Sequence, residues 1–307
     1  MPPIDTIHTY AKINLILQVA PPITDPSDPN CGMHPICSWM HAIDLSDEIT
    51  IEQTPGNQST FDIHWEWGRH PVEWDTKSDL IVRAHALLES ESGRPLPVKI
   101  TASKSIPAGG GLGGGSSNAA GVLMGLNDLF DLGYNEQQLQ SVALKLGSDI
   151  PFFIDISSYR VGIPPKPAVV SGFGEQIERT PRLDDSFYIF VPKFGCSTAE
   201  VYKALDALGS TRVLDPERVL KAATLMKIDP SELINDLTEP AMIVQPELRT
   251  IFARFRDVQV EARLSGSGSS IFIFQSQGGA KKSGWLSAVQ PHEFVQDKLG
   301  FQAASLS

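Results

Sequence analysis

The stretch that decides the fold reads Pro107-Ala108-Gly109-Gly110-Gly111-Leu112-Gly113-Gly114-Gly115-Ser116-Ser117-Asn118-Ala119-Ala120. Glycine loses more conformational freedom on folding than any other residue, so such a dense run of it needs a physical reason. Without side chains in the way, successive backbone N–H groups can surround an anion. The glycine run therefore predicts a loop that binds phosphate.

The residues after this loop strengthen the prediction. The apolar spacing of Ala119–Phe130 is helical. Unpaired N–H groups and the macrodipole make a helix N-terminus favourable for negative charge. Ser116 and Ser117 add hydroxyls, either of which could donate to phosphate or ligate a magnesium ion. A flexible linker is the alternative, but a linker does not usually lead directly into a well-patterned helix.

The glycine stretch differs from two common nucleotide motifs. No Gly-Lys-Ser/Thr follows the glycines, as a Walker A loop requires. The preceding strand and the glycine spacing do not fit a Rossmann unit either. The phosphate loop therefore belongs to another class.

Composition and charge exclude several classes of protein. The 307 residues are 41% hydrophobic and 20% charged, which is typical of a globular chain with room for two domains. The formal net charge is −11, and Lys281-Lys282 is too short for a basic patch, so a nucleic-acid partner is not expected. An acidic protein that binds an anion must attract it locally, with backbone dipoles.

The cysteines and the N-terminus predict a cytoplasmic protein. Cys31, Cys37 and Cys196 are odd in number and not spaced like a metal site, so reduced thiols are expected. Met1–Asp5 lacks the charge and apolar run of a signal peptide, and the longest apolar stretches are too short to span a membrane.

Apolar periodicity predicts intermixed strands and helices, which is an α+β architecture. The expected strands are Ile13–Val19, Ile43–Glu52, Phe61–Trp67, Val98–Ala102, Tyr188–Val191 and Ile271–Phe274. The expected helices are Asp79–Leu88, Ala119–Phe130, Glu136–Leu146, Ser197–Leu208, Asp215–Met226 and Glu247–Arg256. Prolines and glycines between residues 155 and 185 predict the domain boundary there, giving domains 1–160 and 161–307.

The glycine stretch resembles the phosphate-loop motif of the GHMP kinase superfamily. Its long glycine run and Ser-Ser-Asn-Ala-Ala ending resemble one branch of that superfamily in particular. Further segments resemble motifs of the same branch in order and spacing, over residues 8 to 275. These are Ala11-Lys12-Ile13-Asn14-Leu15, Gly32-Met33-His34 with Ser38 and Met40, Leu146–Phe153, Asn235-Asp236-Leu237 and Leu264-Ser265-Gly266-Ser267-Gly268.

The resemblance implies a fold and a reaction. The fold would be an N-terminal ATP-binding domain like the second domain of ribosomal protein S5, over 1–160, and a ferredoxin-like α/β domain over 161–307. The reaction would transfer the γ-phosphoryl of ATP to the 2-hydroxyl of a cytidine diphosphate ester of methylerythritol, in the non-mevalonate isoprenoid pathway. Two alternatives stay open: a kinase for a homoserine-, mevalonate- or sugar-like alcohol, and a non-catalytic nucleotide sensor.

The resemblance also implies catalytic roles. Asp149 would be the general base and Lys12 would hold it ionised and stabilise developing charge. Asn14 would bind the substrate diol, and it shares a strand face with Lys12 because side chains two apart point the same way. Without the resemblance, Asp149 could equally be a cap or turn residue and Lys12 an edge lysine.

Binding residues follow from the same motifs. Magnesium is expected to arrive with ATP, held mainly by phosphate and water. The residues expected to bind ATP are Lys104 near the adenine, then Pro107, Gly109, Gly110, Gly111, Leu112, Gly113, Gly114, Gly115, Ser116 and Ser117. Gly266 and Gly268 would let the chain pass close to phosphates and substrate.

The expected cytidine pocket departs from the family at one position. His34 would read the cytosine edge through its ring nitrogens, and Tyr202 would stack on the base. Met33 stands where the family usually has tyrosine, and its thioether would contact the other face. The insertion Pro21–Cys31 borders this pocket. The expected partner is this small molecule, with neither nucleic acid nor membrane, and the oligomeric state stays open.

Overall fold

The computed structural model describes residues 6–66, 72–183, 186–225, 232–274 and 303–305. These residues form two compact units, each assembled from separate parts of the chain. Unit 1 comprises Met1–Ala11, Asp44–Pro107 and Gly113–Lys166, and unit 2 comprises Lys12–Ile43, Ala108–Leu112 and Pro167–Ser307. The last break lies close to the predicted boundary, whereas the prediction did not anticipate that 12–43 and 108–112 group with the C-terminal part. The domains 1–160 and 161–307 stay a prediction.

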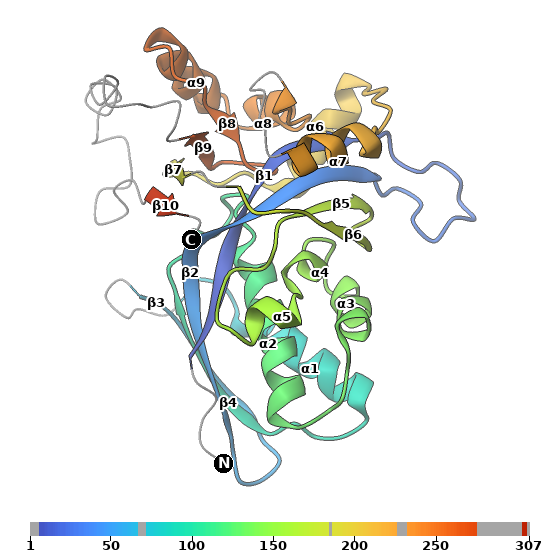
Figure 1. Cartoon of the computed structure of the whole chain (residues 1–307), viewed down its shortest axis with the longest axis vertical. Helices are drawn as coiled ribbons and strands as arrows, with labels where there is room; N and C mark the ends of the chain where they lie inside the picture. Colours follow the sequence, from blue (N-terminus) through green and yellow to red (C-terminus); the bar gives the residue numbers. More distant parts are fainter. Residues whose placement is uncertain (1–5, 67–71, 184–185, 226–231, 275–302, 306–307) are drawn as a thin grey trace. The chain divides into compact units, whose positions relative to one another are not determined.

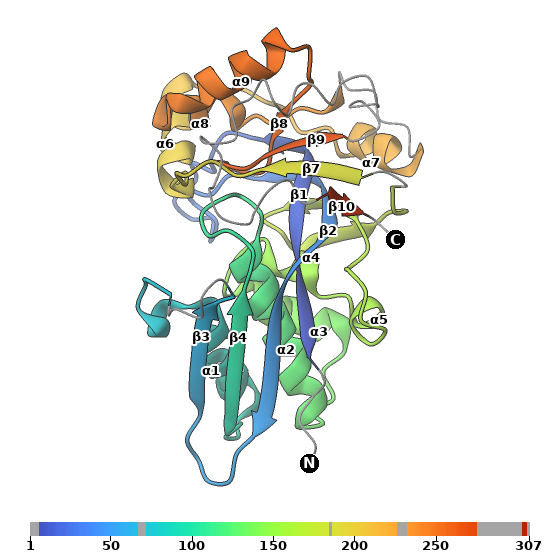
Figure 2. The same cartoon turned by 90° about the vertical axis from the view of Figure 1, so that its left-hand side faces the viewer.

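Unit 1 is a sheet with its helices on one face (Figures 1 and 2). Its strands are the first part of β1 (Ile7–Val19), the last part of β2 (Ile36–Gln53), β3 (Thr60–Trp65) and β4 (Val98–Lys104). β4 pairs antiparallel with Glu48–Gln53 of β2 and parallel with β3. The helices are α1 (Leu80–Ser92), α2 (Gly114–Leu129), α3 (Glu136–Leu144), α4 (Ile150–Phe153) and α5 (Ile156–Tyr159), with a 3₁₀ turn at Thr76–Ser78.

Two glycines let α2 lie directly against β1. A Cβ atom on Gly121 would come within 2.4 Å of Cγ2 of Thr9, and one on Gly125 within 2.8 Å of Cδ1 of Ile7. Real Cβ atoms do not approach so closely, so a side chain at either position would force Thr9 or Ile7 to move. The contact fixes the helix that follows the glycine loop onto the sheet of unit 1.

The described residues of unit 2 form two groups of strands and four helices. The first part of β2, Ile36–Met40, pairs antiparallel with β5 (Ala168–Gly172), which pairs in turn with β6 (Gln176–Arg179). A second sheet has the order β10-β7-β9-β8, formed by Ala303–Ser305, Ser186–Phe190, Ile271–Phe274 and Arg263–Leu264. The helices are α6 (Thr198–Leu208), α7 (Pro216–Leu225), α8 (Thr238–Val244) and α9 (Glu247–Asp257).

Aromatic rings join the second sheet to its helices. Phe187 of β7 lies against Phe272 and Phe274 of β9, with ring centroids 6.1 and 4.8 Å apart. Phe190 meets Phe255 of α9 edge to face at 5.7 Å. Such pairs add about 0.5–1.5 kcal/mol each beyond the apolar area that they bury. Side chains alternate along these strands, so Phe187, Phe272 and Phe274 stack on one face of the sheet, whereas Phe190 on the opposite face contacts α9.

The α+β prediction is confirmed, and several helix starts agree with their cap residues. Asn135 forms a capping box with Gln138 at the start of α3, and Ser197 accepts from the backbone N–H of Glu200 at the start of α6. The side chain of Asp79 likewise accepts from the backbone N–H of Ile81 at the start of α1.

Three predicted boundaries are wrong. The helix α2 begins at Gly114 rather than Ala119, so Gly114–Ser117 are helical. Of the glycine stretch, the segment Gly109–Leu112, called the first glycine group below, is loop. β1 begins at Ile7, and its first residues alternate between buried and more exposed side chains. β2 begins at Ile36, and its first half is buried on both faces without a period-2 pattern. Residues 168–179, within the stretch where the domain boundary was predicted, form the β5–β6 hairpin, whose turn contains Gly172 and Gly174 at positive φ.

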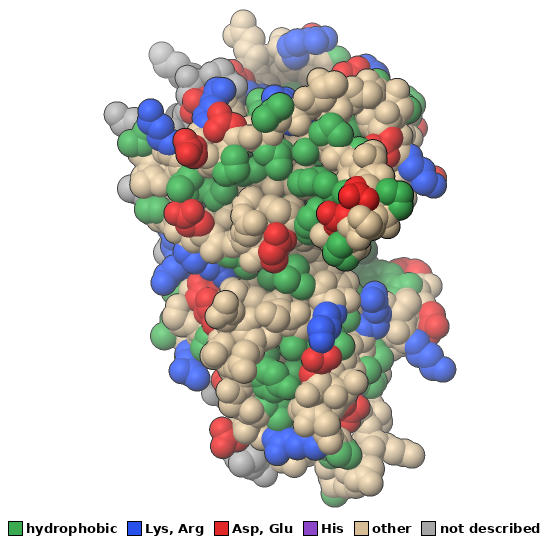
Figure 3. All heavy atoms as spheres, turned by 90° about the vertical axis from the view of Figure 1, so that its right-hand side faces the viewer, with side chains coloured by type: hydrophobic (Ala, Val, Ile, Leu, Met, Phe, Trp, Pro, Cys, Tyr) green, Lys and Arg blue, Asp and Glu red, His purple; other side chains and the backbone are tan. Residues whose placement is uncertain are grey.

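Some predicted features lie outside the described residues. These are Trp67, Met226 and the stretch 276–302 with 306–307, including Lys281-Lys282, Trp285 and Phe294. Within the described residues, no helix has both the length and the apolar character needed to cross a bilayer. On the face drawn in Figure 3, lysine and arginine side chains are interspersed with aspartate and glutamate.

The three cysteines are free thiols, as expected. Burial raises the pKa of Cys37 to about 11, with Asp215 acting in the same direction, and raises that of Cys196 to about 11. Thiols that stay protonated are poor nucleophiles and poor metal ligands, so these two are structural.

A buried histidine makes unit 2 sensitive to acid. His41 is fully buried, its Nδ1 donates to the carbonyl of Ala42 at 2.8 Å, and its Nε2 accepts from the N–H of Leu183 at 3.2 Å. Burial lowers its pKa from 6.5 to about 4, opposed by the Ala42 contact and assisted by Arg182. The folded protein therefore holds this ring neutral.

This depressed pKa gives a signed prediction. Between pH 6.5 and 4 the His41 ring is protonated in the unfolded chain but stays neutral in the folded protein. The free energy of unfolding therefore falls as the pH falls. The slope from this residue should approach about 1.4 kcal/mol per pH unit. Denaturant melts at several pH values would measure it, and His41→Gln should show a shallower slope. An unchanged slope in that variant would contradict the assignment.

Candidate active site

The first glycine group is held in place by its carbonyl groups. Those of Gly109 and Gly110 accept from the N–H groups of Cys196 and Ser270, at 3.3 and 3.0 Å. The carbonyl of Leu112 accepts from the N–H of Lys12 at 2.8 Å. Three different segments of unit 2 therefore clamp this loop.

Because the protein bonds the carbonyl groups of this loop, its backbone N–H groups are left to bind a ligand. Among the described residues, no N–H from 109 to 112 donates a hydrogen bond within the protein. Gly109, Gly111 and Gly113 have φ between 69° and 74°, alternating with residues of ordinary φ. Such alternation turns successive N–H groups toward one point and forms an anion-binding concavity.

The helix that follows is also uncapped by any side chain. Gly113 is its N-cap, with no side-chain hydrogen bond, and Ser117 makes the first intrahelical bond by donating to the carbonyl of Gly113 at 2.8 Å. The N–H groups of the first turn, Gly114 to Ser116, precede that bond and point out of the N-terminus, where an anion is favoured. In unit 1 this helix end thus has the electrostatics expected of a phosphate contact.

Close approach of backbone explains why Gly111 has no side chain. A Cβ atom there would lie 2.2 Å from the carbonyl oxygen of Ser265 and 3.1 Å from the N atom of Gly268. The motif segment Leu264–Gly268 therefore lies directly against Gly111 of the glycine loop. Both Gly266 and Gly268 also have positive φ, which side chains rarely adopt.

Lys12 and Asn14 meet at this junction, as their shared strand face predicted. The ammonium group of Lys12 donates to Oδ1 of Asn14 at 2.6 Å and to the carbonyl of Gly111 at 2.9 Å. A Cβ on Gly266 would be 3.2 Å from both Lys12 Nζ and Asn14 Oδ1. The structure thus brings Lys12, Asn14, Gly111 and Gly266 together within unit 2.

Asp149 lies in unit 1, directly before α4. It is half-buried and occupies the cap position, yet its side chain makes no capping hydrogen bond to that helix. The alternative role as a cap residue is therefore not supported by the hydrogen bonding. Its pairing with Lys12, which belongs to unit 2, stays a prediction.

Lys104 lies in a buried polar cluster of unit 1. Its ammonium is 3.3 Å from Oδ2 of Asp47 and also bonds Oδ1 of Asn118. The carboxylate of Asp47 accepts from the N–H groups of Ser105 and Ile106 at 2.6 and 2.7 Å, and from Asn118 Nδ2 at 2.9 Å. The cluster ties the end of β4 to the first turns of α2. Contact of Lys104 with adenine stays a prediction.

The ring of His34 is engaged on both nitrogens. Nδ1 is 2.9 Å from the carbonyl of Ala20, and Nε2 is 3.2 Å from Oδ1 of Asp206. Tyr202 of α6 lies beside it, with ring centroids 5.1 Å apart. The structure thus brings His34 and Tyr202 together as predicted. A cytosine edge could reach the ring nitrogens only by replacing one of these partners, because each already faces an acceptor.

Met33 and the insertion are joined by backbone hydrogen bonds. The carbonyl of Met33 accepts from Ile23 at 2.9 Å, and the carbonyl of Ile23 accepts from Gly32 at 2.8 Å. These bonds close the insertion into a loop whose ends lie next to His34. Met33 is 45% exposed, so its thioether is accessible to a ligand.

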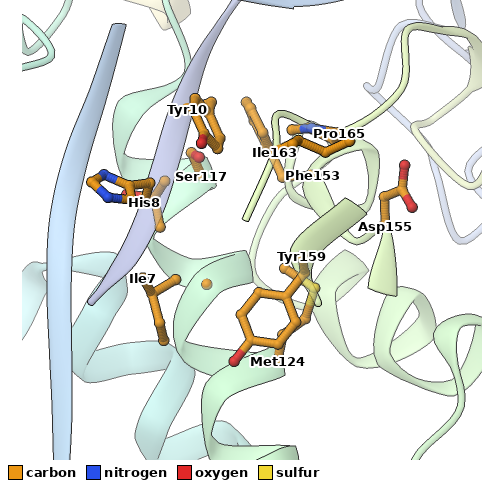
Figure 4. A pocket seen from close by; sticks show the side chains of 12 residues that line it. Ile7, His8, Tyr10, Ser117, Met124, Phe153, Asp155, Tyr159, Ile163 and Pro165 are labelled. Carbon is orange, nitrogen blue, oxygen red and sulfur yellow. The ribbon is translucent and has the colours of Figure 1, made fainter. Parts of the chain in front are cut away.

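The two serines after the glycines differ in environment. Ser117 is buried and lines a small pocket of about 30 Å³ in unit 1, and Figure 4 shows it near Tyr10 and Phe153. That volume suits about one water molecule and excludes a nucleotide. Ser116 is half-buried instead. The structure favours Ser116 as the hydroxyl for a phosphate or its metal.

No protein cage for a metal exists among the described side chains, where no group of three His, Cys, Asp or Glu residues is placed to hold one. The lone pairs of Asp47 are occupied by nitrogen donors. Magnesium commonly binds through few protein ligands together with substrate phosphates. The donor set therefore fits a magnesium ion only as one carried by a nucleotide.

Sequence reasoning missed three positions that support the site. Asp47 and Asp206 carried no motif, although Asp47 takes a buried position in the alternation of Leu45, Ile49 and Ile51, and Asp206 follows Tyr202 by one helical turn. Ser38 was quoted in a motif and given no role. An unexplained charged or polar residue inside an apolar strand was the available signal.

The fold and the glycine loop together define a class of protein. Residues 79–155 match the family model described as GHMP kinases N terminal domain. The fold matches a homoserine kinase from Cytophaga hutchinsonii with a TM-score of 0.59 at 18% identity, over 93% of this chain and 89% of that one. An L. major mevalonate kinase matches with a TM-score of 0.60 at 14% identity, over 93% and 90%. Both likenesses establish the GHMP kinase fold.

Closer relatives narrow this class. A chloroplastic 4-diphosphocytidyl-2-C-methyl-D-erythritol kinase of Arabidopsis thaliana is 31% identical, over 98% of this chain and 72% of the relative. The enzyme of that name from Citrifermentans bemidjiense is 31% identical over 91% and 95%. A crystal structure of 4-(cytidine 5'-diphospho)-2C-methyl-D-erythritol kinase is 28% identical with a TM-score of 0.64, over 88% and 89%. The chain belongs to the 4-diphosphocytidyl-2-C-methyl-D-erythritol kinase family, which confirms the resemblance.

The close approach at Gly111 predicts a large effect of one methyl group. In Gly111→Ala the new Cβ must push the loop away from Ser265, and misplaced positioning groups commonly cost about 100-fold in rate. We expect kcat/KM for ATP to fall by at least about 10-fold. Gly133→Ala is the matched control, because Gly133 has φ 76° and nothing within 4 Å of its Cβ. Equal losses in both variants would show that strain, not loop displacement, is responsible.

Proposed function

We propose that this protein transfers the γ-phosphoryl group of ATP to the 2-hydroxyl of 4-diphosphocytidyl-2-C-methyl-D-erythritol. The observation that carries the proposal is the loop at 109–112, whose carbonyls are all hydrogen-bonded within the protein while its N–H groups are not. That arrangement gives an acidic chain a fixed, local attraction for a triphosphate. Membership of the kinase family supports the choice of acceptor.

The loop and the N-terminus of α2 would bind the triphosphate in succession, because residue 112 is joined directly to residue 113. Backbone dipoles aimed at the phosphates need no reorganisation when charge shifts during transfer. The hydroxyl of Ser116 would add one donor or one metal ligand. A magnesium ion brought by ATP would neutralise charge between the β and γ phosphates.

Asp149 would accept the proton of the 2-hydroxyl as that oxygen forms its bond to the γ-phosphorus. The bond between that phosphorus and the β–γ bridging oxygen breaks, and ADP leaves with the electron pair. Lys12, with its ammonium fixed by Asn14 and Gly111, would stabilise the charge that develops on the transferred group. Asn14 would hold the substrate diol beside it.

The base pocket would be formed by Met33, His34 and Tyr202. Tyr202 would stack on one face of cytosine, and Met33 would contact the other face through its thioether. The ring of His34, held between Ala20 and Asp206, would define one wall.

A cytoplasmic location is also proposed, supported by the three free thiols, and cell fractionation would test it.

A coupled assay of ADP release tests the substrate directly. The purified protein, ATP and magnesium should turn over with the cytidine diphosphate ester of methylerythritol. Homoserine, mevalonate and galactose serve as competing acceptors in parallel. Turnover with one of these and none with the cytidine compound would reject the proposed substrate, and ATP binding without turnover on any would favour a sensor.

Replacing the proposed base should separate binding from chemistry. We expect Asp149→Asn to leave the Kd for ATP within a few-fold while kcat falls at least ~100-fold, the scale of lost general-base catalysis. The exposed Asp257 at the end of α9 provides the control Asp257→Asn, which should retain activity. Unchanged kcat in Asp149→Asn would exclude it as the base.

Restoring the aromatic residue at position 33 tests the base pocket. Met33→Tyr should tighten binding of the cytidine substrate by roughly 0.5–1.5 kcal/mol, because a ring can stack where the thioether only touches. Binding of cytidine diphosphate by calorimetry would measure the change, with adenosine diphosphate as the comparison ligand. Weaker cytidine binding would place Met33 outside the pocket.

A further inference from the structure

A buried hydroxyl lies behind the Lys12 and Asn14 pair. Oγ of Ser38, in the first part of β2, is 2.8 Å from Nδ2 of Asn14 and 2.8 Å from the carbonyl oxygen of Ile16. Ser38 has no exposed surface, and Asn14 and Lys12 are 2% and 3% exposed. All of these residues belong to unit 2.

The single hydroxyl proton fixes the direction of these hydrogen bonds. The carbonyl of Ile16 can only accept, so the Ser38 hydroxyl donates to it. The lone pairs of Oγ then face Asn14, which must present its NH₂ group there. The carbonyl oxygen of the Asn14 amide consequently faces Lys12, at 2.6 Å from the ammonium nitrogen.

The opposite amide orientation would be unfavourable at both ends. A rotation of 180° would place the NH₂ group of Asn14 against the ammonium of Lys12, where two donors meet and no bond forms. Lys12 would lose the shorter of the two contacts to Asn14 and Gly111. Burial makes such a mismatch costly, because no water replaces the lost partner.

We propose that Ser38 is a positioning residue, which sets the orientation of the Asn14 amide and through it the place of the Lys12 ammonium. The proposal rests on the proposed function in that Lys12 and Asn14 act on the transferred phosphoryl and its acceptor. The relay runs from the carbonyl of Ile16 through Ser38 and Asn14 to Lys12. It ends at the carbonyl of Gly111, which Ser265 Oγ also bonds at 3.0 Å.

Steady-state kinetics provide the first test. Ser38→Ala removes the acceptor for Asn14, and we expect kcat to fall roughly 10- to 100-fold, the scale of misplaced reacting groups. KM for ATP should change little, because the loop N–H groups are untouched. Ser38→Thr keeps the hydroxyl and should recover more of kcat than alanine does. A variant Ser38→Ala with wild-type kcat would overturn the proposal.

A double-mutant cycle separates positioning from general damage to the core. If Ser38 acts through Asn14, adding Ser38→Ala to Asn14→Ala should produce no further loss of kcat. If the hydroxyl only supports packing, the two losses should multiply instead, and the proposal fails. Thr180→Val is the matched control, since the buried Thr180 hydroxyl has no hydrogen-bond partner in the described structure. Its kcat should equal that of the wild type.

A measurement that does not depend on turnover tests the role of Ser38 separately from the proposed substrate. Hydrogen exchange of the Asn14 side-chain NH₂, followed by nuclear magnetic resonance, should be slow in the wild type and at least about 10-fold faster in Ser38→Ala, because a protected hydrogen bond is lost. Equal exchange in the two proteins would reject the relay. If exchange changes while the wild type has no kinase activity on the cytidine substrate, the relay stands and the proposed function falls.

Discussion

The hydrogen bonds that hold the carbonyl groups of the glycine loop are the constraint on which the rest depends. Gly109, Gly110, Gly111 and Leu112 each accept from the protein, so the loop keeps one conformation despite its many glycines. A free glycine-rich segment would lose much entropy on binding a ligand, whereas this one has lost it on folding. Lys12 contributes twice, through its N–H and through its ammonium. The side chain proposed to stabilise the reaction is thus part of the structure that shapes the phosphate loop.

Burial gives these interactions their strength. In unit 2, Lys12, Asn14 and Ser38 form a nearly dry chain of hydrogen bonds, and in unit 1, Asp47, Lys104 and Asn118 form another. Removing one partner from such a cluster leaves a polar group unpaired and costs far more than loss of an exposed pair. The glycine run begins five residues after Lys104, and Asn118 lies in the first turns of α2, so the second cluster fixes what precedes and follows the loop. Neither cluster depends on the overall charge of −11.

Because the chain is acidic overall, its proposed ligand has to be bound through local contacts, separately at the phosphates and at the base. A net charge of −11 disfavours a large polyanion, while a small nucleotide needs only the short-range field of aligned peptide dipoles. The cytidine end is proposed to rest on stacking and on a histidine held by Asp206, which are again local interactions. In that proposed pocket, Met33 in place of tyrosine would soften the contact with one face of the base.

The sequence by itself determined the α+β class, most helices, the glycine loop and the kinase family. These depend on local patterns: apolar spacing, cap residues such as Asn135, and a motif of contiguous residues. It also predicted that Lys12 and Asn14 share a face, because strand periodicity is local. Only the tertiary structure decided that α2 starts at Gly114 and that β2 extends to Ile36. It also decided that Ser38, Asp47 and Asp206 contact Asn14, Lys104 and His34. Those outcomes depend on partners tens to hundreds of residues away, and a pattern along the chain does not record which distant groups meet.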